Sequence, residues 1–334
     1  MTQKRTSAGI LGTGWCVPEK TVTNSDLEKM VDTSDAWIVE RTGIHERHVA
    51  AEGQPVSDLA ERAARMALED AGVAAEDLDL IIVATLTSDR IIPSTACILQ
   101  DRLGAKKAAA FDLSAACSGF AYGAAVASQF IAGGVYRHVL VIGAETLSKV
   151  VDWTDRNTCI LFGDGAGAAV FGPVEDGYGL LGFDLGSDGS GGDVLDIPAS
   201  GSLHPVTKEA LEAHQQYIHM DGKAVFRFAV KIMGHTVEEA LKKSNHTKEE
   251  LDWLVPHQAN IRIIDSAAKR LELPMEKVII NIEKYGNMSA ASIPVALAEA
   301  AHAHRFKKGD LIALAGFGAG LTWASCIVKW AKED

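Results

Sequence analysis

Short apolar runs alternate with amphipathic stretches along most of the chain. In the first half these runs occupy residues 8–11, 78–83, 108–113, 139–143 and 166–171, and in the second half residues 251–255, 278–282, 311–315 and 324–328. Apolar runs of this length between helical segments are typical of buried strands whose two faces are covered by helices. The pattern therefore predicts an α/β protein with a layered α/β/α/β/α arrangement.

The pattern is also duplicated. A helix end, a turn and an apolar strand at residues 67–83 recur at residues 240–255 with a shift of 173, so that Leu251 repeats Leu78. A repeat of this size indicates two copies of one supersecondary unit. We therefore expect an N-terminal half at residues 1–175 and a C-terminal half at residues 176–334. Residues 199–220, which are polar with a helical stretch at 207–216, interrupt the second copy and predict an insertion over a site.

Composition narrows the class of protein. The 334 residues are 47% hydrophobic and 23% charged, as in an ordinary globular chain. No apolar run approaches the roughly 20 residues of a membrane span, and Gly12 and Gly14 interrupt the N-terminal run before it could serve as a signal peptide. We therefore expect a cytoplasmic protein. A net charge of −12 argues against a nucleic-acid surface, so an anionic partner would need a local basic patch.

Cys117 stands at a junction suited to a nucleophile. It follows the predicted strand at 108–113 and precedes a small-residue helix that begins near Ser118. A helix N-terminus favours a thiolate and lowers the pKa of a cysteine placed there. Cys117 could equally be a buried packing residue, as free cysteines often are.

The remaining four cysteines lack such a setting. The five cysteines are odd in number and widely spaced, and none forms a C-x-x-C pair, which argues against a disulfide framework or a zinc site. We interpret the four as packing residues: Cys16, Cys97, Cys159 and Cys326.

Three segments of the second half carry further candidate chemistry. His257 follows the strand at 251–255, and strand ends open onto crevices in α/β layers, although a lone histidine is more often structural. Asn287, among small residues, could point its amide into a cavity or serve as a turn or cap residue. The glycines of residues 316–320 (GFGAG) could bring backbone N–H groups to an oxyanion or form a plain tight turn.

Taken together, four segments resemble β-ketoacyl-(acyl carrier protein) synthase III. They are residues 115–120 (AACSGF), 256–260 (PHQAN), 286–292 (GNMSAAS) and 316–323 (GFGAGLTW). That family belongs to the thiolase superfamily and starts bacterial fatty-acid synthesis by joining an acyl-coenzyme A primer to malonyl-(acyl carrier protein). The resemblance covers about residues 8–330 and implies the thiolase-like duplicated five-layer fold and a homodimer.

The resemblance also implies catalytic roles for Cys117, His257 and Asn287. The combination of Cys, His and Asn is similar to the catalytic residues of the initiating synthases. Elongation synthases resemble a Cys, His, His pattern instead, and thiolases a Cys, His, Cys pattern. It further implies an oxyanion hole made by the backbone N–H groups of Cys117 and Ala319, and no metal or redox cofactor. Two residues depart from the family pattern: Met288 stands where Thr is usual, and Ala319 where Gly is common.

Binding residues are implied by the same resemblance. For coenzyme A they are Trp37, Arg41, Arg156, Gly222, Phe226, Ala229 and Asn260. Without the resemblance, Trp37 and Phe226 would be interpreted as core and the arginines as solvated. Ile92 corresponds to a family position that bounds the acyl pocket across the dimer, and it is smaller than an aromatic residue.

A basic helix face offers a docking surface. Lys269 and Arg270 follow Arg262 by seven and eight residues, which is about two helical turns, so the three share one face. This face fits an acidic acyl carrier protein, or it is an ordinary surface helix. Two alternatives to the initiating synthase stay open: a related condensing enzyme of secondary metabolism, and a non-catalytic protein that binds acyl carriers or coenzyme A.

Overall fold

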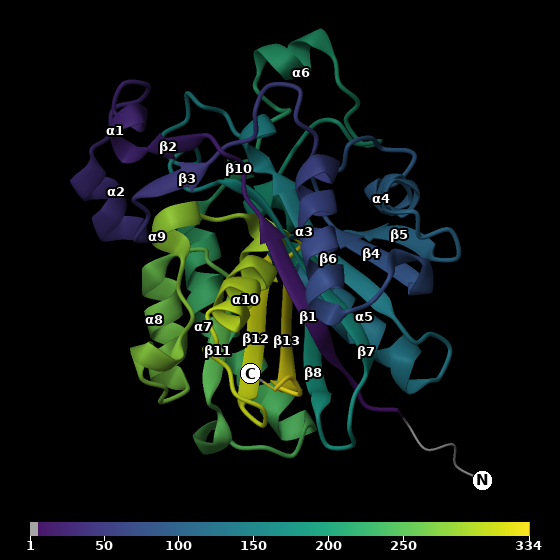
Figure 1. Ribbon diagram of the computed structural model, residues 1–334. Helices are drawn as coiled ribbons and strands as arrows, with labels where there is room; N and C mark the ends of the chain where they lie inside the picture. Colours follow the sequence, from purple (N-terminus) through teal and green to yellow (C-terminus); the bar gives the residue numbers. More distant parts are fainter. Residues whose placement is uncertain (1–5, 334) are drawn as a thin grey trace.

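Two β-sheets form the framework of the computed structural model, which describes residues 6–333 (Figure 1). The first sheet contains, in spatial order, β1 (Ala8–Cys16), β7 (Asp164–Pro173), β6 (Val139–Thr146), β4 (Leu80–Ala84) and β5 (Ala109–Leu113). The second contains β11 (Trp253–Pro256), β12 (Leu311–Gly318), β13 (Thr322–Lys329) and β8 (Gly179–Ser187). The chain passes from the first sheet to the second between β7 and β8.

Helices cover both faces of each sheet. Helices α5 (Gly119–Ala132) and α10 (Ser292–His302) lie between the sheets and share one core cluster with both. Helices α3 (Val56–Ala71) and α4 (Thr95–Leu103) pack on the outer face of the first sheet, and α7 (Gly222–Lys243) and α8 (Ile261–Arg270) on the outer face of the second. The predicted five-layer α/β/α/β/α arrangement is therefore confirmed.

Short elements join the layers. The helices are α1 (Asn24–Leu27), α2 (Asp35–Thr42), α6 (Lys208–Glu212) and α9 (Ile282–Tyr285); the strands are β2 (Thr21–Thr23), β3 (Glu46–His48), β9 (Leu195–Asp196) and β10 (His219–Met220). The 3-10 turns are η1 (Ala75–Asp77), η2 (Ala116–Ser118), η3 (Leu147–Lys149), η4 (Gly189–Val194), η5 (Lys248–Glu250), η6 (Met275–Lys277) and η7 (Ser289–Ala291). Within residues 6–333, no helix is long and apolar enough to cross a bilayer.

The apolar runs became strands because both of their faces are buried. In β4, Leu80 and Ile82 belong to the cluster between the sheets, whereas Ile81 and Val83 face α3 and α4. Strand β1 continues beyond residue 11, where it was expected to end, and runs through Gly12 to Cys16. A Cβ on Gly12 would lie 2.3 Å from the Ala71 nitrogen of α3. The absence of that side chain lets α3 lie directly on the strand.

The duplication is visible in the turns that start the two central helices. Turn η2 leads into α5 and η7 leads into α10. The first residues of these turns, Ala116 and Ser289, stand 173 positions apart and both have φ of 45°. The division of the chain at residue 175 stays a prediction.

Two expected elements differ from the structure. The predicted strand at 278–282 is wrong: Val278 makes one isolated bridge to Leu254, and α9 begins at Ile282. The Gln258 side chain takes the place of a strand partner, donating to the Ile279 carbonyl at 3.1 Å and accepting from the Asn281 N–H at 3.1 Å. The helix expected at 207–216 is shorter, because α6 ends at Glu212 and His214 has φ of 58°.

Candidate active site

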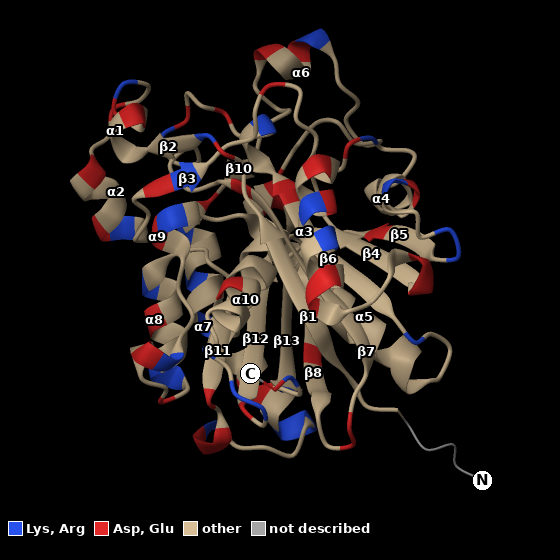
Figure 2. Cartoon of the chain, in the orientation of Figure 1, with Lys and Arg blue, Asp and Glu red and all other residues tan. Residues whose placement is uncertain are grey.

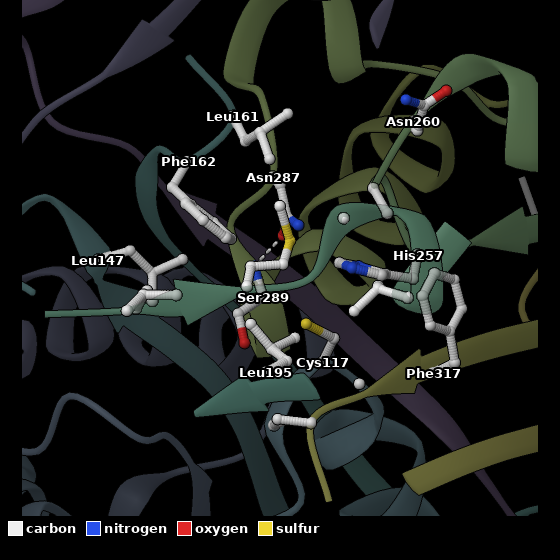
Figure 3. Close-up of a pocket in the computed structure, with 18 of the residues that line it drawn as sticks. Cys117, Leu147, Leu161, Phe162, Leu195, His257, Asn260, Asn287, Ser289 and Phe317 are labelled. Atoms are coloured by element: carbon white, nitrogen blue, oxygen red, sulfur yellow. Dashed lines mark hydrogen bonds between the residues drawn. The ribbon is translucent and has the colours of Figure 1, made fainter. Parts of the chain in front are cut away.

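One cavity of about 340 Å³ collects the candidate catalytic residues from both halves of the chain. Cys117, His257 and Asn287 all line it, and their side chains point into the same space (Figure 3). Most of the wall is apolar. Ile218 and Met220, at the end of the insertion predicted at 199–220, form part of that wall.

Cys117 is held close to the glycine-rich turn of the second sheet. A Cβ on Gly318 would lie 2.6 Å from the Cys117 nitrogen, so only glycine permits this approach. The thiol lies in a buried residue that is 8% exposed. Burial raises the pKa of the Cys117 thiol to about 12, with Ser289 lowering it and the charge of Glu145 raising it.

The expected lowering of the Cys117 pKa is therefore wrong. The thiol is removed from water, and desolvation disfavours the thiolate. This cost exceeds the benefit of the hydrogen bonds that favour the thiolate. Formation of the thiolate consequently needs a proton acceptor or a coupled attack on the substrate.

His257 lies directly after β11 as a neutral side chain. Its backbone N–H donates to the Ala315 carbonyl at 2.7 Å, and its ring meets the edge of Phe317 at a centroid distance of 5.6 Å. Burial lowers the pKa of His257 to about 3. The imidazole therefore has one N–H donor and one acceptor nitrogen at neutral pH.

Asn287 is fixed by its backbone and by its neighbour. Its N–H donates to the Leu161 carbonyl at 2.9 Å and its carbonyl accepts from the Gly163 N–H at 3.0 Å. The side-chain oxygen accepts the Ser289 N–H at 2.8 Å (Figure 3). This bond leaves the side-chain NH₂ group to donate into the cavity.

The two departures from the family pattern do not disturb this arrangement. Met288 is fully buried and packs against Trp15, Val17 and Tyr285, away from the cavity. Ala319 lines the cavity, and its φ is not in the left-handed region, so its Cβ is tolerated there.

A second hollow of about 440 Å³ adjoins the catalytic cavity. Its walls include Trp37 and Arg41, and it shares Gly222, Phe226 and Asn260 with the cavity that contains Cys117. The two hollows therefore lie side by side and have part of their walls in common.

The arginines predicted for coenzyme A flank Trp37. The guanidinium carbons of Arg41 and Arg156 each lie 4.6 Å from the centroid of the Trp37 ring. Asn260 caps α8 by accepting the Arg262 N–H at 2.9 Å. Ala229 is fully buried in the core of the second sheet, and neither Ala229 nor Arg156 lines either hollow.

The three basic residues of α8 differ in their partners. Lys269 forms an exposed ion pair with Asp265 at 2.6 Å, and Arg262 lies with its guanidinium 5.4 Å from the Phe226 ring at the mouth of the second hollow. Arg270 is tied to α7 by Glu238 at 2.8 Å. Basic and acidic positions are mixed along α8 (Figure 2).

Ile92 is 82% exposed and stands between β4 and α4. It lines neither hollow of the single chain. Its predicted place at an acyl pocket therefore depends on a second copy.

Sequence reasoning missed two buried residues near Cys117. Ser289 lines the cavity, and Glu145 stands behind it near the end of β6. The repeat of 173 could have indicated Ser289, because it matches Ala116 next to the cysteine. Within residues 6–333, no cluster of His, Cys, Asp and Glu is suited to hold a metal ion.

Comparisons with known proteins agree with this geometry. Residues 111–189 match the family model of 3-oxoacyl-(acyl carrier protein) synthase III, and residues 241–330 match the model of its C-terminal part. The chain is 59% identical to β-ketoacyl-(acyl carrier protein) synthase III of Desulfitobacterium hafniense, over 98% of this chain and 99% of that protein.

Solved structures are similar as well. The 3-oxoacyl-(acyl carrier protein) synthase III of Aquifex aeolicus superposes with a TM-score of 0.89 at 46% identity, covering 97% of this chain and 100% of that one. The priming β-ketosynthase of the R1128 polyketide pathway superposes with a TM-score of 0.92 at 36% identity, covering 100% and 99%. The chain belongs to the β-ketoacyl-(acyl carrier protein) synthase III family.

Proposed function

We propose that this enzyme transfers an acyl group from acyl-coenzyme A to Cys117 and condenses it with malonyl-(acyl carrier protein). The products are a β-ketoacyl-(acyl carrier protein) and carbon dioxide, which starts fatty-acid synthesis. The observation that carries the proposal is the meeting of Cys117, His257 and Asn287 in one apolar cavity, beside a second hollow that is lined by Trp37.

In the first half-reaction, the Cys117 sulfur attacks the thioester carbonyl and coenzyme A leaves. The backbone N–H groups of Cys117 and Ala319 hold the charge that develops on the carbonyl oxygen. A donor of this kind contributes roughly 3 kcal/mol in other enzymes. The close approach of Gly318 to Cys117 supports this pairing of N–H groups.

In the second half-reaction, loss of carbon dioxide from the malonyl group places negative charge on its thioester oxygen. The N–H of neutral His257 and the NH₂ group of Asn287 donate to this oxygen. The resulting carbanion attacks the acyl group on Cys117 and releases the product. Neither half-reaction requires a metal or a redox cofactor.

The assembly that we propose is a homodimer. Strand β5 is an edge strand of the first sheet, and Phe111 on it is 38% exposed. Unpaired edge strands with apolar side chains favour pairing with another chain. In this arrangement Ile92 reaches the acyl pocket of the partner. The cytoplasmic location expected from the sequence stays a prediction.

A second candidate function is priming in a secondary pathway. The similarity to the R1128 priming β-ketosynthase over the whole chain favours it. The two functions use the same catalytic groups and differ in the primer and the carrier protein.

Intact-protein mass spectrometry tests the proposal. The enzyme is mixed separately with acetyl-, isobutyryl- and hexanoyl-coenzyme A, and the mass added at Cys117 is measured. We expect an acyl adduct in the wild type and none in Cys117→Ala. The absence of any adduct with all three thioesters would reject the proposed function, and the preferred chain distinguishes the two pathways.

A further inference from the structure

A buried carboxylate lies behind the wall of the catalytic cavity. Glu145 is fully buried and accepts hydrogen bonds from the Thr87 hydroxyl at 2.6 Å, the Thr85 hydroxyl at 3.3 Å and the Leu86 N–H at 3.3 Å. It does not line the cavity. These three donors from the loop after β4 hold the carboxylate in one orientation without neutralising its charge.

Ser289 separates this carboxylate from the nucleophile. Turn η7, which begins with Ser289, packs against both β6 and η2, the elements that carry Glu145 and Cys117. The hydroxyl is close enough to the Cys117 sulfur and to the Glu145 carboxylate to lower the pKa of each. It is nevertheless buried and has no well-formed hydrogen bond in this structure. A free hydroxyl between an acid and a thiol can accept a proton from one and donate a proton to the other.

The carboxylate is the stronger of the two bases beside Cys117. Burial raises the pKa of Glu145 to about 7, whereas burial lowers the pKa of His257 to about 3. A base whose pKa lies near neutrality is suited to accept a proton at physiological pH. The imidazole, by contrast, binds a proton too weakly to serve as the acceptor.

Few other titratable groups face Glu145. The buried faces of β4, α3, α5 and α10 carry apolar and small residues. On β7 the residue opposite Glu145 is Gly165, and the neighbouring Asp164 carboxylate accepts the N–H groups of Ala50 and Ser148. The pKa of Glu145 is accordingly set by burial, which raises it, and by hydrogen bonds from Thr87, Leu86, Ser289 and Thr85, which lower it.

We propose that Ser289 and Glu145 form the proton relay that activates Cys117 for acylation. As the sulfur bonds to the thioester carbonyl carbon, its proton passes to the Ser289 oxygen and the Ser289 hydroxyl proton passes to Glu145. When the carbon–sulfur bond to coenzyme A breaks, the same path returns the proton to the leaving thiolate. Coenzyme A leaves as the thiol, and the Glu145 carboxylate is restored.

The relay and a purely electrostatic role of Glu145 predict opposite changes in the rate at which Cys117 is acylated. The negative charge of Glu145 raises the pKa of Cys117, so a purely electrostatic role predicts that Glu145→Gln makes Cys117 more reactive. The relay predicts that the same variant acylates more slowly, because glutamine cannot accept the proton. The direction of the change therefore separates the two roles.

Two variants test the relay, which rests on the proposed function. Glu145→Gln retains a hydrogen-bond acceptor for the three donors, and Ser289→Ala retains the N–H that holds Asn287. Alanine is compatible with the φ of 45° at position 289, since Ala116 adopts the same angle. Matched controls are Glu299→Gln, which alters a carboxylate bonded to Asn281 and Tyr285, and Ser128→Ala, which alters a buried serine of α5.

Acylation of Cys117 by acetyl-coenzyme A is measured by rapid quench and intact mass between pH 5.5 and 9. We expect the wild-type rate to rise as Glu145 ionises near pH 7. Both relay variants should lose this rise and be slowed at pH 7.5 by at least about 10-fold. The double variant should be no slower than the slower single variant, because the two residues act as one unit. The controls should keep the wild-type profile.

The acylation rates of the wild type and of the two variants distinguish a failure of the relay from a failure of the proposed function. If the wild type takes up acetyl and Glu145→Gln acylates equally fast or faster, the relay is wrong and the function stands. The same conclusion follows if either variant keeps the rise near pH 7. A wild type that accepts no acyl group from any coenzyme A thioester overturns both.

Discussion

The two polar side chains that share the cavity of Cys117 owe their chemistry to their surroundings. Burial lowers the pKa of His257 to about 3, so the side chain stays neutral, and in the proposed mechanism it serves the enolate as an N–H donor. Asn287 is restricted to the same role, because the Ser289 N–H occupies its oxygen. At the residue scale, the cavity therefore offers two neutral donors to an oxygen that becomes negative only during decarboxylation.

Replacing either donor should affect the two half-reactions unequally. We expect His257→Ala and Asn287→Ala to slow decarboxylation of the malonyl thioester by roughly 100-fold or more, since each removes a donor aimed at the developing charge. Acylation of Cys117 should change less. Carbon dioxide release and acyl uptake are measured on the same preparations, with Cys117→Ala as the control that loses acylation. Equal losses in both half-reactions would contradict these roles.

Met288 contributes to packing and not to the chemistry of Asn287. Its side chain is fully buried against Trp15, Val17 and Tyr285. We expect Met288→Thr to lower the free energy of unfolding by about 2–4 kcal/mol, through a cavity and a buried hydroxyl. Urea unfolding measures this loss, with Met30→Thr on the exposed loop after α1 as the control. Lost acylation at unchanged stability would show that Met288 acts on the site instead.

At the element scale, the sequence predicted those strands whose two faces are buried, because they read as continuous apolar runs. It failed at 278–282, where the pattern was equally apolar but Gln258 occupies the backbone groups that a strand partner would need. No local pattern reports such a tertiary hydrogen bond. The direction of the Cys117 pKa was missed for the same reason, since its burial depends on segments from both halves.

The contact between β6 and η7 couples the fold to the site. A Cβ on Gly143 would lie 2.1 Å from the Ala290 carbonyl oxygen, so Gly143→Ala must displace the turn that carries Ser289. We expect a loss of about 1–3 kcal/mol in unfolding free energy and slower acylation of Cys117. Urea unfolding and acyl uptake measure the two effects. Gly201→Ala, whose Cβ meets no neighbour, should change neither. A Gly143→Ala variant that matches the wild type in both assays would refute the coupling.

At the scale of the whole molecule, the proposed function requires an acidic carrier protein to dock on an enzyme with a net charge of −12, and we propose that it does so near the mouth of the second hollow. Lys269 is the cleaner probe of docking on α8, because Arg262 lines the mouth itself and Arg270 is tied to α7. We expect Lys269→Glu to raise the KM for malonyl-(acyl carrier protein) about fivefold, equivalent to about 1 kcal/mol, with acylation by acetyl-coenzyme A unchanged. Steady-state kinetics at low salt measure this, with Lys242→Glu on α7 as the control. An unchanged KM would reject this dock.

The exposed edge of the first sheet is the surface through which we expect two copies of the chain to form the homodimer. Ile91 and Ile92 are 90% and 82% exposed in the loop before α4, whose first residues Thr95 and Ala96 donate their N–H groups to Asp112 of the edge strand β5. A twofold pairing of β5 with its copy would cover this surface and the Phe111 ring. We expect Phe111→Glu to give monomers with reduced acylation, because Ile92 then no longer reaches the partner's pocket.

Light scattering after size exclusion measures the mass of the assembly. Met30→Glu, at another exposed apolar position, is the control and should leave the dimer intact. If Phe111→Glu stays dimeric, the edge is not the interface; if its monomers acylate at the wild-type rate, the pocket is complete within one chain.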